Sequence, residues 1–319
     1  MTETTKIVFE RFQIRKTKPQ KRAFSDFVGR VATNSGYLFT PETIGSSTDL
    51  VVGDPYNADV IFTAHYDTCP RLPLPNFITP KNLLIYIIYQ IALSAVILFP
   101  FFAVLFFPII MGNAGFEIFY DLYPIFFLLS YALLFVILYF LKAGPANKHT
   151  ANDNTSGVTV LLDLMQAMPR ELRPRAAFIF FDNEEVGLLG SKAYVRKHWE
   201  AMKHKLLINF DCVSDGNNIL FAVKKKAAPQ AEVIRKAFDA VNNGDFNVDV
   251  ATKGVFYPSD QMLFPKGVGV AALKKSKKLG VLYMDKIHTS KDTVYEEKNI
   301  EFLVRGSINL TSALSAHYE

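Results

Sequence analysis

The stretch IFTAHYDT at residues 61–68 places an imidazole and a carboxylate two residues apart. It predicts a buried strand, because apolar and partly β-branched residues lead into His65 and Asp67. Side chains two apart on a strand point to the same face. A carboxylate beside an imidazole is how proteins fix the tautomer of a metal-binding histidine. The pair alone is equally compatible with a structural hydrogen bond, so its interpretation depends on the rest of the chain.

Six groups of the kinds that bind Zn²⁺ lie just past predicted strands or in the loops that follow them. They are two imidazoles and four carboxylates: His65, Asp153, Glu184, Glu185, Asp211 and His288. Each has a structural alternative, such as a helix cap, a first-turn acid, a turn carboxylate or a surface histidine. Four carboxylates at one sheet edge would, however, repel one another without a cation. Nitrogen and oxygen ligands without thiolate suit a hydrolytic zinc site better than a structural one.

The elements that must position these groups alternate between strand and helix. Strands are predicted at residues 37–44, 49–52, 59–64, 176–181, 206–210, 219–223, 246–251, 268–273 and 281–284. Helices are predicted within residues 5–35, where Pro19 can separate two of them, and at residues 156–168, 188–198, 230–242 and 297–315. This alternation predicts an α/β fold with a mostly parallel mixed sheet flanked by helices. In such sheets, functional groups gather at the carboxyl ends of the strands.

Two apolar runs without a charged residue interrupt this pattern, at residues 83–107 and 122–141. A bilayer core of roughly 30 Å needs about 20 apolar residues of helix, so both runs are long enough to cross it. The alternative is a buried helical hairpin, but two such runs in tandem are too long for a small core. Pro100 and Pro108 should kink or end the first helix, whereas Pro124 falls in the first turn of the second, where it costs little.

The predicted organisation is one domain interrupted by an insertion. The domain comprises residues 1–80 and 143–319, and residues 81–142 form a transmembrane hairpin with helices at about 83–107 and 118–141.

The flanks of the hairpin indicate its orientation. Lys81 precedes the first run, Lys142 and Lys148 follow the second, and the loop between the runs has no basic residue. The positive-inside rule therefore predicts an integral membrane protein with its domain in the cytoplasm. Two cysteines, Cys69 and Cys212, give no disulfide framework, which favours a reducing compartment.

Five segments together carry a resemblance to a known family. They are HYD at 65–67, NDNTSG at 152–157, DNEEVGLLGS at 182–191, FD at 210–211 and IHTSKDT at 287–293. This ordered set resembles the co-catalytic di-zinc aminopeptidase family, the metallopeptidases of the bacterial leucyl aminopeptidase, glutamate carboxypeptidase and glutaminyl cyclase fold. The resemblance covers residues 1–80 and 143–319 and implies a zinc exopeptidase-like fold with two co-catalytic zinc ions.

Carried over residue by residue, the resemblance implies a role for each metal ligand. It implies that Asp153 bridges the two zinc ions. It implies that His65 and Asp211 complete the shell of one ion, and that Glu185 and His288 complete the shell of the other.

The resemblance also implies roles beside the metals. Glu184 is the general base that takes a proton from water and passes it to the leaving amine. Asp67 orients His65, as the strand spacing indicates independently. The peptide bond between Asp153 and Asn154 is a candidate for the cis geometry common in the family.

A tyrosine is a candidate for stabilising the oxyanion. Tyr257, in FYPSDQ, resembles a substrate-side segment of the family, but its spacing to Asp260 differs from the family pattern. A core tyrosine is the alternative.

The expected function is a membrane-anchored zinc exopeptidase, most simply an aminopeptidase acting on peptides at or near the membrane. The alternatives are a glutaminyl-cyclase-like acyltransferase and a non-catalytic membrane adaptor. The hairpin lies between His65 and Asp153, so the site should sit close to the membrane surface, and the hairpin either contacts substrate or only anchors the chain. The expected partners are a peptide and the lipid bilayer, with no nucleic acid, and the hairpin could hold an oligomer together.

Overall fold

Nine strands form a single sheet in the computed structural model, which describes residues 1–316. They are β1 (Phe39–Ile44), β2 (Ser47–Val52), β3 (Val60–His65), β4 (Ala176–Phe181), β5 (Leu206–Phe210), β6 (Asn218–Val223), β7 (Asn247–Ala251), β8 (Gly267–Lys275) and β9 (Leu282–Tyr283). Their order across the sheet is β1-β2-β4-β3-β5-β8-β6-β7, and β9 pairs with β8.

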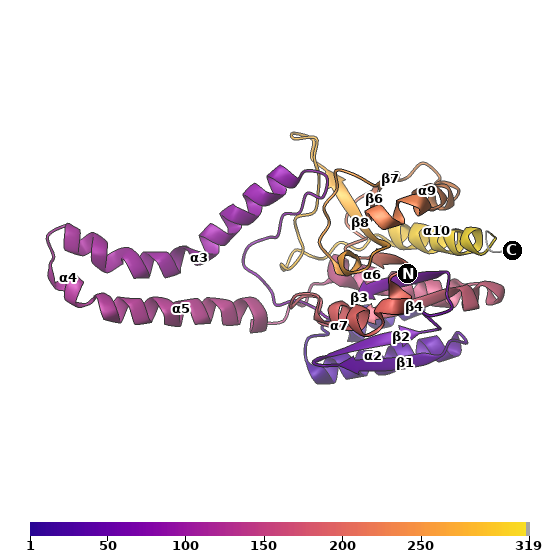
Figure 1. Cartoon of the computed structure of the whole chain (residues 1–319), viewed down its shortest axis with the longest axis horizontal. Helices are drawn as coiled ribbons and strands as arrows, with labels where there is room; N and C mark the ends of the chain where they lie inside the picture. The colour runs from indigo at the N-terminus through magenta and orange to yellow at the C-terminus, as the bar shows by residue number, and fades with distance from the viewer. Residues whose placement is uncertain (317–319) are drawn as a thin grey trace.

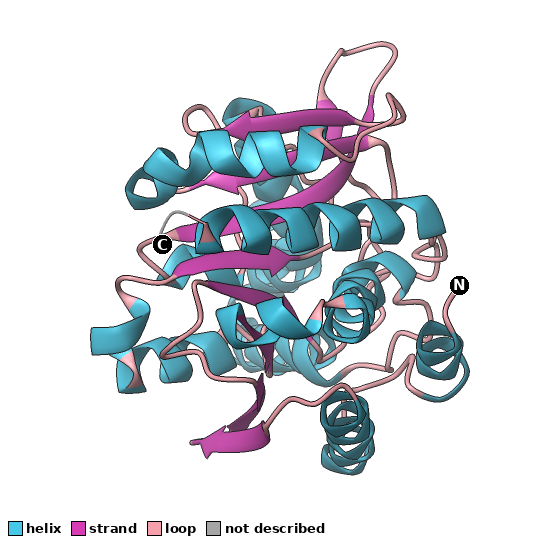
Figure 2. Ribbon diagram, turned by 90° about the vertical axis from the view of Figure 1, so that its right-hand side faces the viewer, coloured by secondary structure: helices cyan, strands magenta, loops and turns pink. Residues whose placement is uncertain are grey.

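The strands in the middle of the sheet are parallel. β4, β3, β5 and β8 run in the same direction, β6 and β7 also pair in parallel, and the remaining pairs are antiparallel. Every residue of β3, β4 and β5 is buried, because helices cover both faces of the sheet (Figure 2). The predicted fold class, a mixed α/β sheet flanked by helices, is confirmed.

Within the described residues, ten α-helices surround or leave this sheet. They are α1 (Glu3–Arg11), α2 (Lys18–Asn34), α3 (Leu83–Asn113), α4 (Ile118–Asp121), α5 (Tyr123–Ala143), α6 (Gly157–Ala167), α7 (Leu189–Lys197), α8 (Trp199–Met202), α9 (Ala231–Asp239) and α10 (Glu297–Ser315). Short helical turns cover Ala151–Ser156, Arg170–Arg175, Lys225–Gln230 and Asp260–Leu263. Pro19 lies in the first turn of α2, where its missing N–H costs nothing, so it begins a helix and separates it from α1.

The two faces of the sheet pack against different helices because strand side chains alternate. On β3, Phe62 joins the larger core cluster, which takes in side chains of α1, α2, α6, α9 and α10. The neighbouring Ile61 points to the opposite cluster, which includes side chains of α7 and α8. This covering on both sides leaves the ends of the central strands as the place where polar loops can meet.

Helices α3 and α5 pack against each other and project away from the sheet (Figure 1). α3 runs through Pro108 to Asn113, so the expected end at residue 107 is too early. Each proline removes one intrahelical hydrogen bond but leaves the rest of the ladder, and α3 is bent rather than ended (Figure 1). Pro124 lies at the start of α5, where proline is tolerated.

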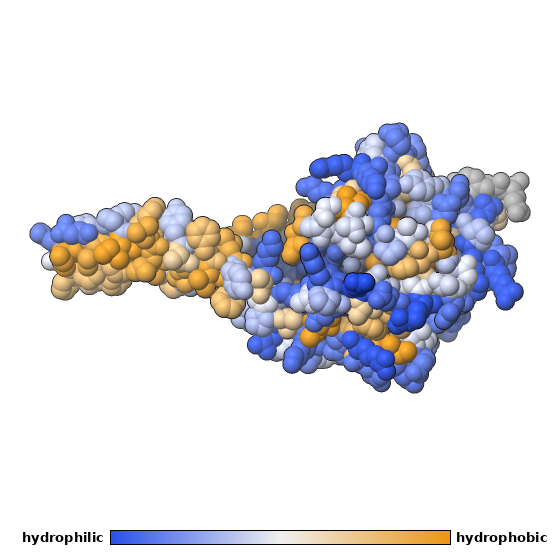
Figure 3. Space-filling view, turned by 90° about the horizontal axis from the view of Figure 1, so that it is seen from below, coloured by the Kyte–Doolittle hydropathy of each residue, from blue (hydrophilic) through white to orange (hydrophobic). Residues whose placement is uncertain are grey.

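The face of this projection seen in Figure 3 is mostly apolar, with hydrophilic residues at its far end and along one edge. Both α3 and α5 are long and apolar enough to cross a membrane, and only 6% of the most apolar window of each is buried. They are therefore not core helices of the sheet domain, which is what the buried-hairpin alternative required.

Candidate metal centre

The parallel strands bring the predicted site residues to one edge of the sheet. His65 is the last residue of β3, Glu184 and Glu185 follow β4, and Asp211 comes directly after β5. Because these three strands are parallel neighbours, their carboxyl ends meet at this edge. Asp153 lies in the helical turn that leads into α6, and the loop after β9 carries His288.

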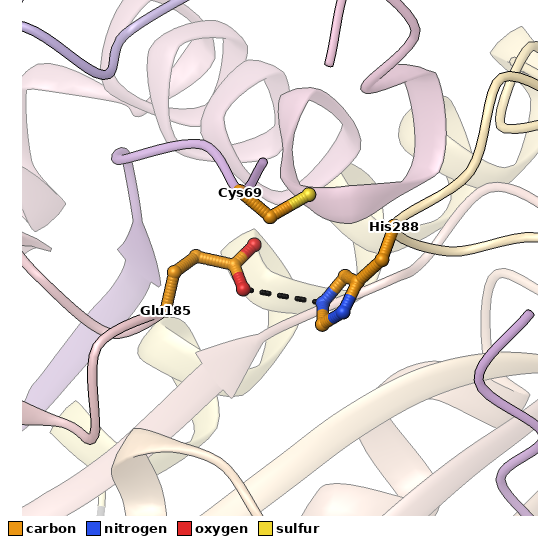
Figure 4. Close-up of side chains that lie close together, drawn as sticks. All are labelled: Cys69, Glu185 and His288. Carbon is orange, nitrogen blue, oxygen red and sulfur yellow. Dashed lines mark ion pairs between the residues drawn. The ribbon is translucent and has the colours of Figure 1, made fainter. Parts of the chain in front are cut away.

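One carboxylate lies between two imidazoles. Asp153 Oδ1 is 3.3 Å from Nε2 of His65, and Asp153 Oδ2 is 3.0 Å from Nε2 of His288. Asp211 Oδ1 joins the first imidazole, 3.6 Å from His65 Nε2. Glu185 Oε2 joins the second, 3.1 Å from His288 Nε2 (Figure 4). The donors thus form a His65 group and a His288 group that share Asp153, the grouping that the family resemblance implies.

Asp67 connects the first group to the loop after β4. The Nδ1 atom of His65 lies 3.2 Å from the Asp67 main-chain oxygen and 3.5 Å from its carboxylate. The same carboxylate accepts hydrogen bonds from the main-chain amides of Glu184 (3.0 Å) and Glu185 (3.2 Å). Asp67 therefore fixes both an imidazole and the backbone that carries the two adjacent glutamates.

The charges and the burial of the site strongly shift the pKa values of its two histidines and of Glu184. Burial favours neutral imidazole, but the carboxylates of Glu184, Asp153 and Asp211 outweigh it and raise the pKa of His65 well above its usual value. Glu185 and Asp153 do the same to the pKa of His288. Burial raises the pKa of Glu184 well above its ordinary value. Because several acids crowd two imidazoles in a largely buried site, the arrangement calls for positive charge at the centre.

The donor set fits a metal centre on independent grounds. Its nitrogen and oxygen donors are those that zinc takes in hydrolytic sites. One donor atom each from His65, Asp153 and Glu185 lies within 4.8 Å of the others. In the described part of the chain, Glu185 Oε1 is buried without a hydrogen-bond partner, which is costly unless something else satisfies it.

A carboxylate that the sequence reasoning did not single out supports the shared aspartate. Asp292 is buried and accepts hydrogen bonds from the main-chain amides of Asn152 (2.8 Å) and Asp153 (2.9 Å). Burial, followed by the charge of Asp153, raises the pKa of Asp292 to about 8. Its signal in the sequence is its place in IHTSKDT, four residues after His288.

The buried side chain of Arg15 is hydrogen-bonded to the residue that directly follows β3. Arg15 is 0% exposed, its Nε atom donates to the main-chain oxygen of Tyr66 at 2.5 Å, and its guanidinium also reaches Thr155 Oγ1 at 3.3 Å. These partners lie 51 and 140 residues away in the sequence, so no local motif could have identified Arg15.

Two further predictions concern local geometry. The peptide bond between Asp153 and Asn154 is cis, as the resemblance implied. The hydroxyl of Tyr257 donates to the main-chain oxygen of Asp211 at 2.9 Å, and its side chain is buried. Tyr257 therefore supports the loop that carries a candidate ligand, in line with the structural alternative. Its role at an oxyanion stays a prediction.

Both cysteines lie at the centre, although the sequence reasoning used them only to infer a compartment. Cys69 Sγ groups with donor atoms of Glu185 and His288 within 4.8 Å (Figure 4). Cys212 Sγ groups in the same way with Asp153 and Asp211, and it donates to Asp211 Oδ1 at 3.2 Å. The centre thus has one thiol on each side.

Solved structures with the same fold include enzymes of two kinds. The glutaminyl cyclase of Porphyromonas gingivalis is 15% identical with a TM-score of 0.59, and the match covers 97% of this chain and 96% of that one. The LapA aminopeptidase of Legionella pneumophila is 13% identical with a TM-score of 0.56, over 98% of this chain and 68% of that one. A leucine aminopeptidase precursor from Bacteroides thetaiotaomicron is 12% identical with a TM-score of 0.55, over 96% and 94%.

No curated protein matches the sequence. The model of peptidase family M28, however, matches residues 138–305, which is more than half of the 319 residues. This match includes α6, β4, β5 and most of the candidate donors. The chain therefore belongs to peptidase family M28.

Proposed function

We propose that this protein is a membrane-anchored exopeptidase with two co-catalytic zinc ions, and that it removes residues from the amino terminus of peptides. Membership of family M28 supports a hydrolase. The observation that carries the metal assignment is Asp153, whose two oxygens face the imidazoles of His65 and His288 separately. A carboxylate in this position can serve two cations at once.

The residues divide the work of peptide hydrolysis among them. In this proposal His65, Asp153 and Asp211 hold one ion, and Asp153, Glu185 and His288 hold the other. Bound zinc supplies an acidified water and polarises a carbonyl group.

Glu184 belongs to neither donor group, and Asp67 holds it by its main-chain amide. Its raised pKa suits a carboxylate that takes a proton from water and passes it to the leaving amine.

The base of the hairpin supports both membrane attachment and a cytoplasmic domain. The lining of a surface pocket beside the end of α5 includes five basic side chains, from α2, the segment before it and α5: Lys16, Lys18, Lys21, Arg22 and Lys142. It also includes Asp26 and Asp182, and Lys21 pairs with Asp182. Lys16 also donates to the main-chain oxygen of Gly144 at 2.7 Å, just beyond α5. Basic side chains beside the end of a membrane-spanning helix favour the cytoplasmic side, where they meet anionic lipid headgroups.

An apolar cavity supports a substrate that comes from the membrane. It has a volume of about 480 Å³, and its lining includes Leu93, Val96, Ile97, Val136, Ile137 and Phe140, from both helices of the hairpin. Leu72 also lines it, and the Leu72 amide donates to the main-chain oxygen of His288 at 2.8 Å. The wall of the cavity is therefore hydrogen-bonded to a candidate ligand. We infer that an apolar segment or acyl chain of the peptide lies there, and the alternative is a hairpin that only anchors the chain.

A second candidate function is cyclisation of amino-terminal glutamine. The observation in its favour is that a solved glutaminyl cyclase shares this fold over nearly all of both chains, as the leucine aminopeptidase precursor also does. The two candidates make different products from the same peptide, so one experiment separates them.

The test uses the full chain, purified in detergent with zinc. The substrates are a peptide with a free amino terminus, its acetylated form, its lipidated form and a variant that begins with glutamine. We expect loss of single amino-terminal residues from the free peptides, and faster cleavage of the lipidated one. Loss of ammonia from the glutamine peptide, without cleavage, would establish the cyclase instead. Equal rates on lipidated and unlipidated peptides would establish the hairpin as an anchor only.

Substitution of the proposed base provides the control. Glu184→Gln should lower the rate by about 10²- to 10⁴-fold, the usual contribution of a general base, and should keep bound zinc. Glu200→Gln removes an exposed carboxylate on α8 that, among residues 1–316, pairs only with Lys203, and should leave the rate unchanged. A Glu184→Gln enzyme as active as the wild type would contradict the assignment of the base.

A further inference from the structure

The two halves of the candidate centre differ in a way that the family resemblance does not imply. Cys69 lies four residues after His65, and its side chain is 1% exposed. Its Sγ atom, a carboxylate oxygen of Glu185 and a ring nitrogen of His288 all lie within 4.8 Å of one another. These are the two side chains that, with Asp153, form the His288 group.

A second observation at the same point concerns Glu185. Its Oε2 atom pairs with His288, whereas its Oε1 atom is buried and has no hydrogen-bond partner among the described residues. The side chain is only 6% exposed. Figure 4 shows the carboxylate between Cys69 and His288, with one oxygen toward each. Glu185 Oε1, a buried oxygen that could bind a metal ion, therefore points into the space that the thiol of Cys69 also faces.

Asn147 holds the backbone of Cys69 in this position and also contacts the segment that carries His288. The main-chain oxygen of Cys69 accepts a hydrogen bond from the Asn147 amide at 3.2 Å. The Asn147 side chain in turn donates to the main-chain oxygen of Thr289 at 3.0 Å. The segment that follows α5 thus links Cys69 to the residue beside His288. The thiol and the imidazole are built into one framework rather than meeting as two loose side chains.

We propose that Cys69 is a thiolate ligand of the metal ion held by Asp153, Glu185 and His288. The inference rests on the proposed metal centre. With Cys69 this position has four protein donors, the number found in closed zinc sites. At the other position Cys212 donates its S–H to Asp211 Oδ1, which leaves His65, Asp153 and Asp211 as three donors. Catalytic zinc sites keep a place for water or substrate, so the reacting water belongs on the His65 side.

The thiolate also sets metal preference. Soft sulfur ligands favour zinc over magnesium and manganese, which prefer oxygen donors. The His288 group is therefore the position that selects zinc. A buried cysteine that only packs as a small apolar side chain would neither add a fourth donor nor favour zinc over other metals.

The test replaces zinc with Co²⁺ in the full chain, in detergent, because a thiolate bound to cobalt gives an intense near-ultraviolet charge-transfer band. The wild type should show this band, and Cys69→Ser should lose it while still binding cobalt. Cys212→Ser is the matched control, because Cys212 is the other buried thiol of the centre and lies beside Asp211. It should keep the band.

A band that disappears in Cys212→Ser and remains in Cys69→Ser would overturn the proposal by placing the thiolate in the other group. Cobalt spectra without any thiolate band would overturn it while leaving the metal centre intact. A wild-type chain that binds no cobalt would refute the metal centre as well.

A measurement on Cys212→Ser covers the case in which Cys69→Ser does not fold. The chain has two cysteines, so this variant has Cys69 as its only thiol. X-ray absorption of its bound zinc should show a sulfur neighbour at about 2.3 Å. A zinc shell of nitrogen and oxygen alone would overturn the proposal.

Discussion

Replacing Asp67 by asparagine tests how the centre is held together, because the substitution keeps the shape of the side chain and removes its charge. Both carboxylate oxygens of Asp67 accept main-chain N–H groups, from Glu184 at 3.0 Å and from Glu185 at 3.2 Å. An asparagine has one oxygen and one NH₂ group. It can satisfy one of these amides, but it must turn a donor toward the other.

The expected effect follows from this one lost bond. A hydrogen bond to a charged group contributes about 1.5–3 kcal/mol, and each 1.4 kcal/mol corresponds to about a tenfold change in a binding constant. The loss falls on the backbone that positions Glu185 and on the carboxylate beside Nδ1 of His65. We therefore expect Asp67→Asn to bind zinc about 10- to 100-fold more weakly, the range known for groups that orient metal ligands.

The assay is a zinc titration against a competing chelator, with thermal unfolding measured in parallel. Asp54→Asn is the matched control, because Asp54 Oδ1 also accepts two main-chain amides, from Tyr56 at 2.9 Å and Asn57 at 3.3 Å, but lies in an exposed turn away from the site. It should leave zinc affinity unchanged. If Asp67→Asn and Asp54→Asn bind zinc equally well, the reasoning about Asp67 is wrong.

Two further predictions concern the supports of the site. Arg15→Met leaves the buried carbonyl of Tyr66 without its donor and should lower the free energy of unfolding by roughly 2–3 kcal/mol. Arg30→Met, at an exposed position of α2, should change the free energy of unfolding by about 0.5 kcal/mol or less. Denaturant unfolding of both variants measures the difference, and equal stabilities would contradict a supporting role for Arg15. The hairpin should keep the full chain in the membrane fraction after alkaline carbonate washing, while a variant without residues 83–141 should be released, and release of the full chain would refute membrane insertion.

Much of the fold follows from local pattern. The strands at residues 176–181 and 206–210 and the closing helix α10 have the predicted bounds, because continuous apolar runs and helical periodicity mark them without reference to distant residues. The candidate ligands could be predicted for a related reason: each follows a recognisable strand or opens a recognisable helix. The end of α3 could not, because proline weakens a helix locally while the packing of α3 on α5 decides whether it continues.

The partners of each side chain were decided by tertiary structure alone. The sequence shows that Asp153 carries a carboxylate near a helix start, but only the folded chain places its two oxygens against two imidazoles from separate loops. Arg15 under Tyr66 and Cys69 beside His288 depend on contacts between segments far apart in the chain. Burial makes these contacts energetically important, because a polar group removed from water must pair with a group from whichever segment the fold brings near it.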